Sequence, residues 1–174
     1  MKHGEASDYT ESSFREKLLE HVFVSELLQE AWLNRHETVE VLRSEVDSSG
    51  YDLVIECNGV IRHVQLKSSR AGSHTAQQTV NIKLAEKPSG CVVWLLFEED
   101  TKSCRVKLDY LFFGSGPKKP LPSLDSFRVG KHTRANAKGR KSERPGTRII
   151  PKGKFTKISG FAELMDRLFG PTGR

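Results

Sequence analysis

The sequence predicts an α/β fold in which a mixed central β-sheet is flanked by helices. Two observations predict it: amphipathic helical segments lie near both ends of the chain, and short apolar or alternating runs separated by turn signals lie between them. The chain has 174 residues, 36% hydrophobic and 29% charged, a composition typical of one globular domain spanning 1–174. Its longest apolar run, 91–97, is far too short for a membrane span, so we expect no membrane contact.

The first expected element is a helix that follows a polar, flexible stretch at 1–11. Ser13 and Glu16 form a capping box, with Ser13 as N-cap, and the apolar periodicity continues to about Trp32. Glu20 falls in the middle of the apolar face of this helix. A carboxylate buried there without a partner would be costly. We therefore expect a cation to reach Glu20 from the sheet, although partial exposure or a neighbouring arginine would serve as well.

A β-hairpin is the clearest signal in the first half of the chain. A short strand at 38–42 precedes two longer ones at 51–57 and 60–67, which are joined by Asn58-Gly59, the pair that favours a two-residue turn. In that register Asp52 lies opposite Gln65, and Lys67 shares their face. The opposite face is apolar and is expected to join the core: Leu53, Ile55, Val64 and Leu66.

The remaining elements follow from the same signals. Further strands are expected at 79–84, which runs into a helical turn, and at 91–97 and 104–113. A Pro- and Gly-rich loop follows, and a last amphipathic helix spans 161–169 with Ser159 as its cap. Two tryptophans and two cysteines are expected in the core: Trp32, Trp94, Cys91 and Cys104.

The positive charge of the chain is concentrated in 128–157. The chain carries a net charge of +6, but this segment alone has eleven Lys or Arg residues and one acid. Such a block favours binding to a polyanion, and about six phosphate contacts would give a salt slope near −5. The alternative is a solvated basic loop. The candidate nucleic-acid-binding residues are Lys131, Arg134, Lys138, Arg140, Lys141, Arg144 and Arg148.

Three short motifs resemble the PD-(D/E)XK nuclease superfamily, whose fold is restriction-endonuclease-like: Glu20, Gly50-Tyr51-Asp52 and Val64-Gln65-Leu66-Lys67-Ser68. In that superfamily a helix supplies an acid, one strand an Asp, and the next strand (Asp/Glu)-x-Lys. Gln65-Leu66-Lys67 is similar to the Gln-x-Lys variant of Mrr-like enzymes and some homing endonucleases, and Tyr51 before Asp52 is similar to resolvase-like members. The resemblance covers 14–67 and the strand at 91–97.

The resemblance implies a Mg²⁺- or Mn²⁺-dependent endonuclease that hydrolyses phosphodiester bonds in DNA rather than RNA. Asp52, Gln65, the backbone carbonyl of Leu66 and Glu20 would hold the cation, which prefers oxygen ligands. Lys67 would orient the attacking water and offset developing charge. The chain would then consist of a nuclease-like core at 12–113, a loop and basic segment at 114–157, and a C-terminal helix at 158–170.

Two other functions stay open at this stage. Gln65 in place of an acid is also typical of a site that binds nucleic acid without cutting it, and the basic segment would equally suit docking to an acidic protein. Many members of the resembled superfamily combine two protomers, so a homodimer is a further alternative. Sparse cysteines without metal-ligand spacing and the lack of an apolar leader predict a reducing, cytoplasmic location.

Overall fold

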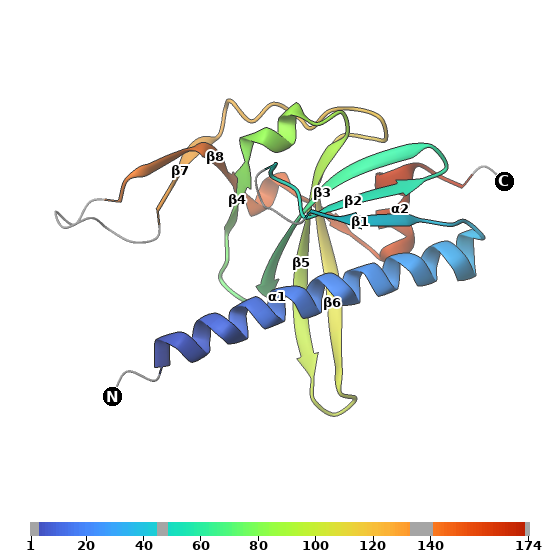
Figure 1. The fold of residues 1–174 in the computed structure, drawn as a ribbon, viewed down its shortest axis with the longest axis horizontal. Coiled ribbons are helices and arrows are strands. Elements are labelled where there is room, and N and C mark those ends of the chain that lie inside the picture. The colour runs from blue at the N-terminus through green and yellow to red at the C-terminus, as the bar shows by residue number, and fades with distance from the viewer. Residues whose placement is uncertain (1–3, 45–48, 133–140, 173–174) are drawn as a thin grey trace.

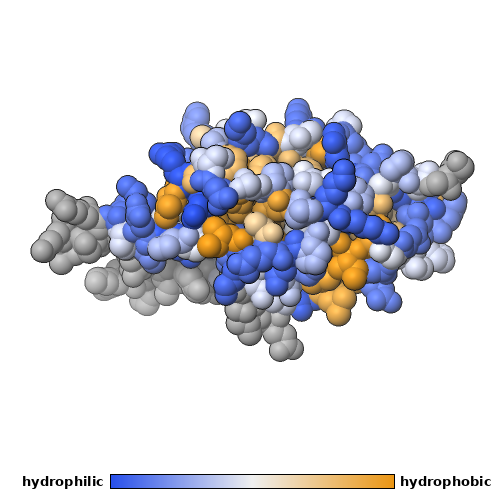
Figure 2. All heavy atoms as spheres, turned by 90° about the horizontal axis from the view of Figure 1, so that it is seen from above, coloured by the Kyte–Doolittle hydropathy of each residue, from blue (hydrophilic) through white to orange (hydrophobic). Residues whose placement is uncertain are grey.

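The computed structural model of the protein describes residues 4–44, 49–132 and 141–172. Within these residues it is an α/β protein with a mixed six-stranded sheet, a smaller three-stranded sheet and two α-helices (Figure 1). The surface seen in Figure 2 is mainly hydrophilic, with hydrophobic side chains gathered in separate patches. The two α-helices and the mixed six-stranded sheet confirm the α/β class and the mixed central sheet expected from the sequence.

The helices and strands follow one another along the chain in a fixed order. In order they are α1 (Gly4–Gln29), β1 (Glu40–Arg43), β2 (Leu53–Cys57), β3 (Val60–Arg70), β4 (Gln77–Asn81), β5 (Gly90–Asp100), β6 (Arg105–Gly114), β7 (Arg128–Lys131), β8 (Glu143–Pro151), β9 (Thr156–Ile158) and α2 (Phe161–Phe169). A π-helical segment, Glu30–Arg35, continues α1, and two short 3₁₀ turns lie at Ile82–Glu86 and Lys152–Lys154.

The six-stranded sheet has the order β1-β2-β3-β5-β6-β9, and only β3 and β5 are parallel neighbours. Parallel neighbours need a crossover connection, and here the crossover carries β4 and a 3₁₀ turn. β4 leaves the large sheet and pairs with β8, which also pairs with β7. The crossover therefore ties the two sheets together beside β3.

Two apolar clusters cover the two faces of the large sheet. On one face α1 and α2 pack through buried residues such as Phe23 and Leu164. On the other face the three-stranded sheet packs through Val80 and Ile150, which meet the fully buried Trp94. The burial of Trp94 was predicted, because a large apolar side chain in the middle of a buried strand gains about 25 cal/mol per Å² removed from water.

The predicted hairpin register is confirmed over β2 and β3. Cys57 pairs with Val60 and Leu53 pairs with Val64, and Asn58 and Gly59 both have positive φ, 50° and 74°, as a type I′ turn requires. The expected core residues Leu53, Ile55 and Val64 are fully buried, and the partly buried Leu66 packs against the same cluster.

The start of the first helix was predicted wrongly. α1 begins at Gly4, so residues 4–11 are helical rather than frayed and Ser13 lies inside the helix instead of capping it. The segment between Gly4 and Ser13 contains no proline or further glycine to stop the helix. Trp32, expected in the core, is 69% exposed, and Cys104 is also exposed.

The basic segment forms strands where a loop was expected. The described part of it contains β7, β8 and β9, because Thr147 and Ile150 are buried in β8 while β4 satisfies its backbone groups. Because charged residues are so frequent in this segment, the buried positions of β8 could not be recognised from the sequence. The last helix agrees with the prediction at Phe161–Phe169, but its N-cap is Gly160; Ser159 instead donates to Glu163 from its backbone N–H at 2.8 Å and its hydroxyl at 2.7 Å.

Candidate functional site

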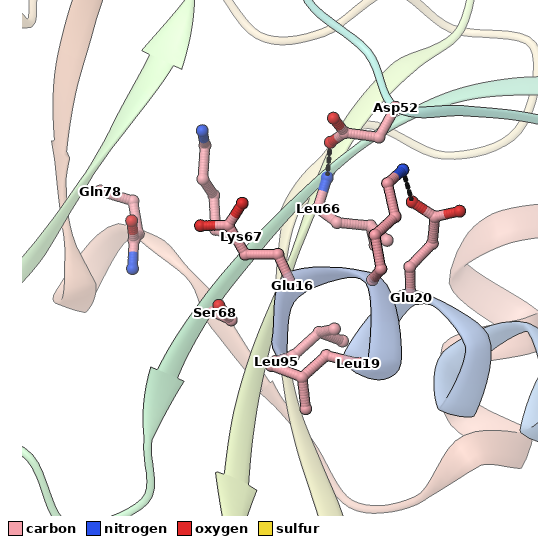
Figure 3. Close-up of a pocket in the computed structure, with 10 residues that line it drawn as sticks. Glu16, Leu19, Glu20, Asp52, Leu66, Lys67, Ser68, Gln78 and Leu95 are labelled. Atoms are coloured by element: carbon pink, nitrogen blue, oxygen red, sulfur yellow. Dashed lines mark hydrogen bonds and ion pairs between the residues drawn. The ribbon is translucent and has the colours of Figure 1, made fainter. Parts of the chain in front are cut away.

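A cavity of about 380 Å³ lies between α1, β3 and β4 (Figure 3). Residues of α1, β3 and β4 converge on it together with Asp52 and Leu95, and most of its lining is polar. The described residues that line it are Glu16, Lys17, Leu19, Glu20, Asp52, Leu66, Lys67, Ser68, Gln78 and Leu95. The structure thus brings together four of the five residues that the sequence assigned to a cation site and its chemistry.

The turn before β2 sets the position of Asp52. Gly50 has φ of +78°, a conformation that other residues rarely adopt, and a Cβ there would lie 2.9 Å from the Asn81 side chain. Tyr51 packs edge-on against His63 with ring centroids 5.0 Å apart. The chain between these two contacts and β2 is therefore held in place, and with it the backbone of Asp52.

Asp52 is anchored to the edge of β3. Its backbone N–H donates to the carbonyl of Val64 at 2.9 Å, and its Oδ2 accepts the N–H of Leu66 at 2.6 Å. Strand pairing between β2 and β3 ends at Leu53–Val64, so Asp52 stands beyond the ladder rather than directly opposite Gln65. Because the N–H and C=O of one strand residue point to the same side, the Leu66 carbonyl faces the edge that carries Asp52.

Lys67 is the residue after Leu66 within β3, and it pairs with Trp94 of β5. Its side chain is half-buried and lines the cavity together with those of Glu16 and Asp52 (Figure 3). An ammonium group and two carboxylates thus border the same cavity, with Lys67 and Asp52 half-buried and Glu16 exposed.

Glu20 borders the cavity but is held by two cations. It is only 7% exposed; its Oε1 accepts from Arg43 Nε at 2.7 Å and its Oε2 from Lys17 Nζ at 3.0 Å. Burial raises the pKa of Glu20, but the hydrogen bonds from Arg43 and Lys17 outweigh burial and hold that pKa below its ordinary value. The cation that reaches Glu20 from the sheet is therefore Arg43 of β1. This is the neighbouring arginine that the sequence analysis gave as an alternative.

Gln65 lies apart from the other predicted residues. It is buried under the end of β4, where its Oε1 accepts the N–H of Asn81 at 3.3 Å, and it is not among the described residues that line the cavity. The sequence-based register placed it beside Asp52, but the ladder stops one residue earlier and β4 covers the position. Because β4 arrives through the crossover, local sequence could not show this.

Glu16 and Gln78 are among the cavity residues that were missed as site residues. Glu16 was assigned to the capping box, although it precedes Glu20 by one helical turn, a spacing that places both on neighbouring surface of α1. Gln78 comes from β4, and its neighbour across the ladder is Ile150 of β8. The spacing in α1 could have identified Glu16, whereas nothing in the sequence pointed to Gln78.

The basic segment is joined to the cavity through β4. β8 is the direct neighbour of β4, so its basic side chains lie one strand away from Gln78. Lys131, Lys141 and Arg144 are exposed, while Arg148 is half-buried and donates to the carbonyls of Pro145 and Thr147. Three more predicted contacts lie outside the described residues: Arg134, Lys138 and Arg140.

The donor set of the cavity is made of oxygen atoms. Within the ranges that the structure describes, no three His, Cys, Asp or Glu side chains are arranged to hold a metal ion. The oxygen atoms at the cavity include the Leu66 carbonyl and the Asp52 carboxylate, whose orientation is fixed by its hydrogen bond to Leu66. Carboxylate and carbonyl oxygens are the ligands that Mg²⁺ and Mn²⁺ accept, usually with several waters.

Comparison with known proteins adds no family assignment: no family model, curated protein or solved structure matches the chain. In the described part of the chain, neither α-helix combines the length and the apolar character that crossing a lipid bilayer requires.

Proposed function

We propose that this protein is a metal-dependent nuclease with a restriction-endonuclease-like fold, which hydrolyses phosphodiester bonds in DNA. The observation that carries the proposal is the meeting of Asp52, Leu66 and Lys67 with two α1 carboxylates at one cavity. These residues come from α1, from the position directly before β2 and from β3, an arrangement similar to the one that the resemblance to the PD-(D/E)XK superfamily implies. The Gln-x-Lys variant of that superfamily supplies the motif on β3.

The Asp52 carboxylate and the Leu66 carbonyl would hold the divalent cation, and Glu16 is placed to contact it through water. When bound, the ion would polarise a phosphate oxygen and lower the pKa of a water molecule. Glu20 acts as a positioning residue, because both of its oxygens are engaged by Arg43 and Lys17. It fixes α1 against β1 and so keeps Glu16 at the cavity.

Lys67 would bind the scissile phosphate from the β3 side. Its ammonium donates hydrogen bonds to a phosphate oxygen and offsets the charge that grows there during attack. The exposed cations of β7 and β8 would contact the phosphate backbone on either side of the cut, because β8 is only one strand removed from the cavity. Contacts of this kind set position and affinity without reading sequence.

A second candidate is a nucleic-acid-binding module of the same fold without hydrolysis. Two observations favour it: Glu20 has both oxygens in ion pairs, and Gln65 accepts a backbone hydrogen bond away from the cavity. A site left with Asp52 and a carbonyl binds a cation weakly. Titration calorimetry with Mn²⁺ separates the two functions, because only the nuclease requires measurable cation binding that Asp52→Asn abolishes.

The deciding experiment is cleavage of supercoiled, linear, single-stranded and branched DNA with Mg²⁺ or Mn²⁺. We expect cutting that is lost on chelation and falls by at least about 100-fold in Lys67→Ala, a loss typical for removal of one electrostatic contact in the transition state. Lys118→Ala, at an exposed lysine distant from the cavity lining, is the matched control and should cut normally. Absence of cutting on every substrate, or cutting that survives Lys67→Ala, would contradict the nuclease proposal.

A further inference from the structure

One face of α1 and its π-helical continuation carries four large apolar side chains that the described part of the chain leaves exposed. Phe14 and Trp32 are 71% and 69% exposed, and Leu18 and Leu28 are 39% and 43% exposed. Apolar side chains this large are usually buried, and several of them in a row mark an interaction surface. We call the row the α1 stripe; its members are Phe14, Leu18, His21, Ser25, Leu28 and Trp32.

The α1 stripe runs straight along the helix. Its members are spaced alternately by four and three residues, the repeat by which one helix seam faces another helix. At 100° per residue the five members within α1 fall within about 80° of the helix circumference, and Trp32 follows in the π-helical segment that continues α1. The opposite side of α1 packs into the core through Leu19, Phe23 and Leu27, so the stripe lies on the side of the helix turned away from the core.

The stripe is arranged symmetrically about Phe23. Outward from Phe23, its members in both directions are a polar residue (His21 or Ser25), then a leucine, then an aromatic residue. The exposed fractions show the same symmetry, since the two leucines match each other and the two aromatic residues match each other. A surface that repeats in reverse order is complementary to itself when a second copy is turned by 180°.

We propose that two copies of this protein form a two-fold dimer in which their α1 helices pack antiparallel through the α1 stripe. Phe14 then lies against Trp32 of the second copy, Leu18 against Leu28, and His21 against Ser25 near the axis. This arrangement covers every apolar member of the stripe with an apolar partner. The occupant of the surface is thus a second copy of the same helix.

The flanks of the helix pair are compatible with this arrangement. Arg15 on one side lies against Gln29 of the second copy, and the half-buried Val22 meets its own counterpart at the axis. No like charges face each other in these flanking positions, whereas like-charge contacts would weaken the pair. Arg43, which contacts His21, is ion-paired with Glu20.

The size of the surface predicts a dimer of moderate strength. The stripe is about 27 Å long at 1.5 Å per residue, and an aromatic side chain can bury roughly 150–250 Å². The helix pair therefore falls near the lower limit of specific interfaces, roughly 1,200 Å² in total. We expect a dissociation constant on the order of 10 µM.

Analytical ultracentrifugation of the full chain tests the proposal at concentrations from about 1 to about 100 µM, on both sides of the expected constant. The wild type should shift from the 19.6 kDa of one chain towards twice that mass. Leu18→Glu and Leu28→Lys, each alone, should raise the dissociation constant by about 100-fold, because each buries a charge against a leucine. Leu42→Glu, at an exposed leucine of β1 outside the stripe, is the matched control and should dimerise like wild type.

The double variant L18E/L28K decides the orientation. In an antiparallel pair the introduced carboxylate meets the introduced amine of the second copy at both ends, so the dimer should return to within about tenfold of wild type. The two positions are about 15 Å apart on one helix, so they cannot pair within a chain. A monomeric wild type, a dimer insensitive to the single substitutions, or a double variant that stays monomeric would each overturn the proposal.

Discussion

The Asp52 carboxylate accepts a hydrogen bond of 2.6 Å from the backbone N–H of Leu66, at the point where β2 stops pairing with β3. This bond has two consequences. It provides an acceptor for the Leu66 N–H, which lies beyond the end of the β2–β3 ladder. It also fixes the carboxylate beside the Leu66 carbonyl and Lys67. The same residue therefore has a structural role and, in the proposed function, a cation-binding role, and the two can be separated by substitution.

Asp52→Asn and Asp52→Ala should differ in stability and agree in cation binding. The asparagine keeps an oxygen for the Leu66 N–H and should unfold at nearly the wild-type urea concentration, whereas the alanine should lose about 1–2 kcal/mol through the unsatisfied donor. Both should lose the binding of Mn²⁺ seen by calorimetry. Equal stability of the two variants would show that the hydrogen bond contributes nothing to folding.

Arg43→Met should destabilise the protein by about 1–3 kcal/mol, because the buried Glu20 would keep only the exposed Lys17 as partner. The pKa of Glu20 is lowered from its ordinary 4.5, so the stability from this pair is present above pH 4.5 and lost as the pH falls through the lowered value. The difference between wild type and Arg43→Met should therefore shrink in acid. Arg105→Met, at an exposed arginine, should show no such pH dependence, and a constant difference for Arg43→Met would refute the pairing.

Glu26→Gln should stabilise the protein at neutral pH. Burial raises the pKa of Glu26, and the hydrogen bond from the Tyr110 hydroxyl offsets only part of this. A raised pKa means that wild-type stability is highest below pH 4.5 and is lost as the pH rises through the folded-state value. Glutamine still accepts the Tyr110 hydrogen bond without a charge, so we expect a gain on the order of 1 kcal/mol. Thermal melts across the pH range, with the exposed Glu86→Gln as control, should show a gain that vanishes in acid; a gain independent of pH would contradict this cause.

Arg62→Met should destabilise the protein by about 2–4 kcal/mol. The Arg62 side chain is fully buried and donates to Ser89 Oγ at 2.9 Å and to the carbonyls of Gly116 and Ser115 at 3.0 and 3.2 Å. Removing it would leave these acceptors without their donor and release the 114–117 loop from the sheet. Urea unfolding gives the loss, and proteolysis should cut this loop first; unchanged stability would show that the loop is held by other contacts.

Neutralising three exposed cations should weaken DNA binding and its salt dependence together. We expect K131Q/K141Q/R144Q to reduce the slope of log K against log[salt] by about 2.7, at about 0.9 per phosphate contact. The matched triple K102Q/K118Q/K119Q removes the same charge from exposed positions outside β7 and β8. If both triples reduce the slope equally, only net charge matters and the β7–β8 surface is not the binding surface. Fluorescence anisotropy with a labelled duplex measures both slopes.

The sequence alone determined the features that depend on local spacing. The Asn58-Gly59 turn fixed the register of β2 against β3, because only a few turn geometries join two strands across two residues. The alternation around Val64 determined which face enters the core, and the periodicity at 161–169 identified α2. Glu20 was also recognised as a buried carboxylate in need of a cation, since burial of an unpaired charge is costly wherever the partner comes from.

Tertiary structure decided the partner and the surroundings of those groups. Arg43 reaches Glu20 because β1 packs beside α1, and Gln65 is covered because the crossover places β4 over it. The basic segment forms strands because β4 completes the ladder of β8, a pairing between residues some seventy positions apart. Such contacts depend on how distant segments pack, and side-chain spacing within one segment carries no information about them.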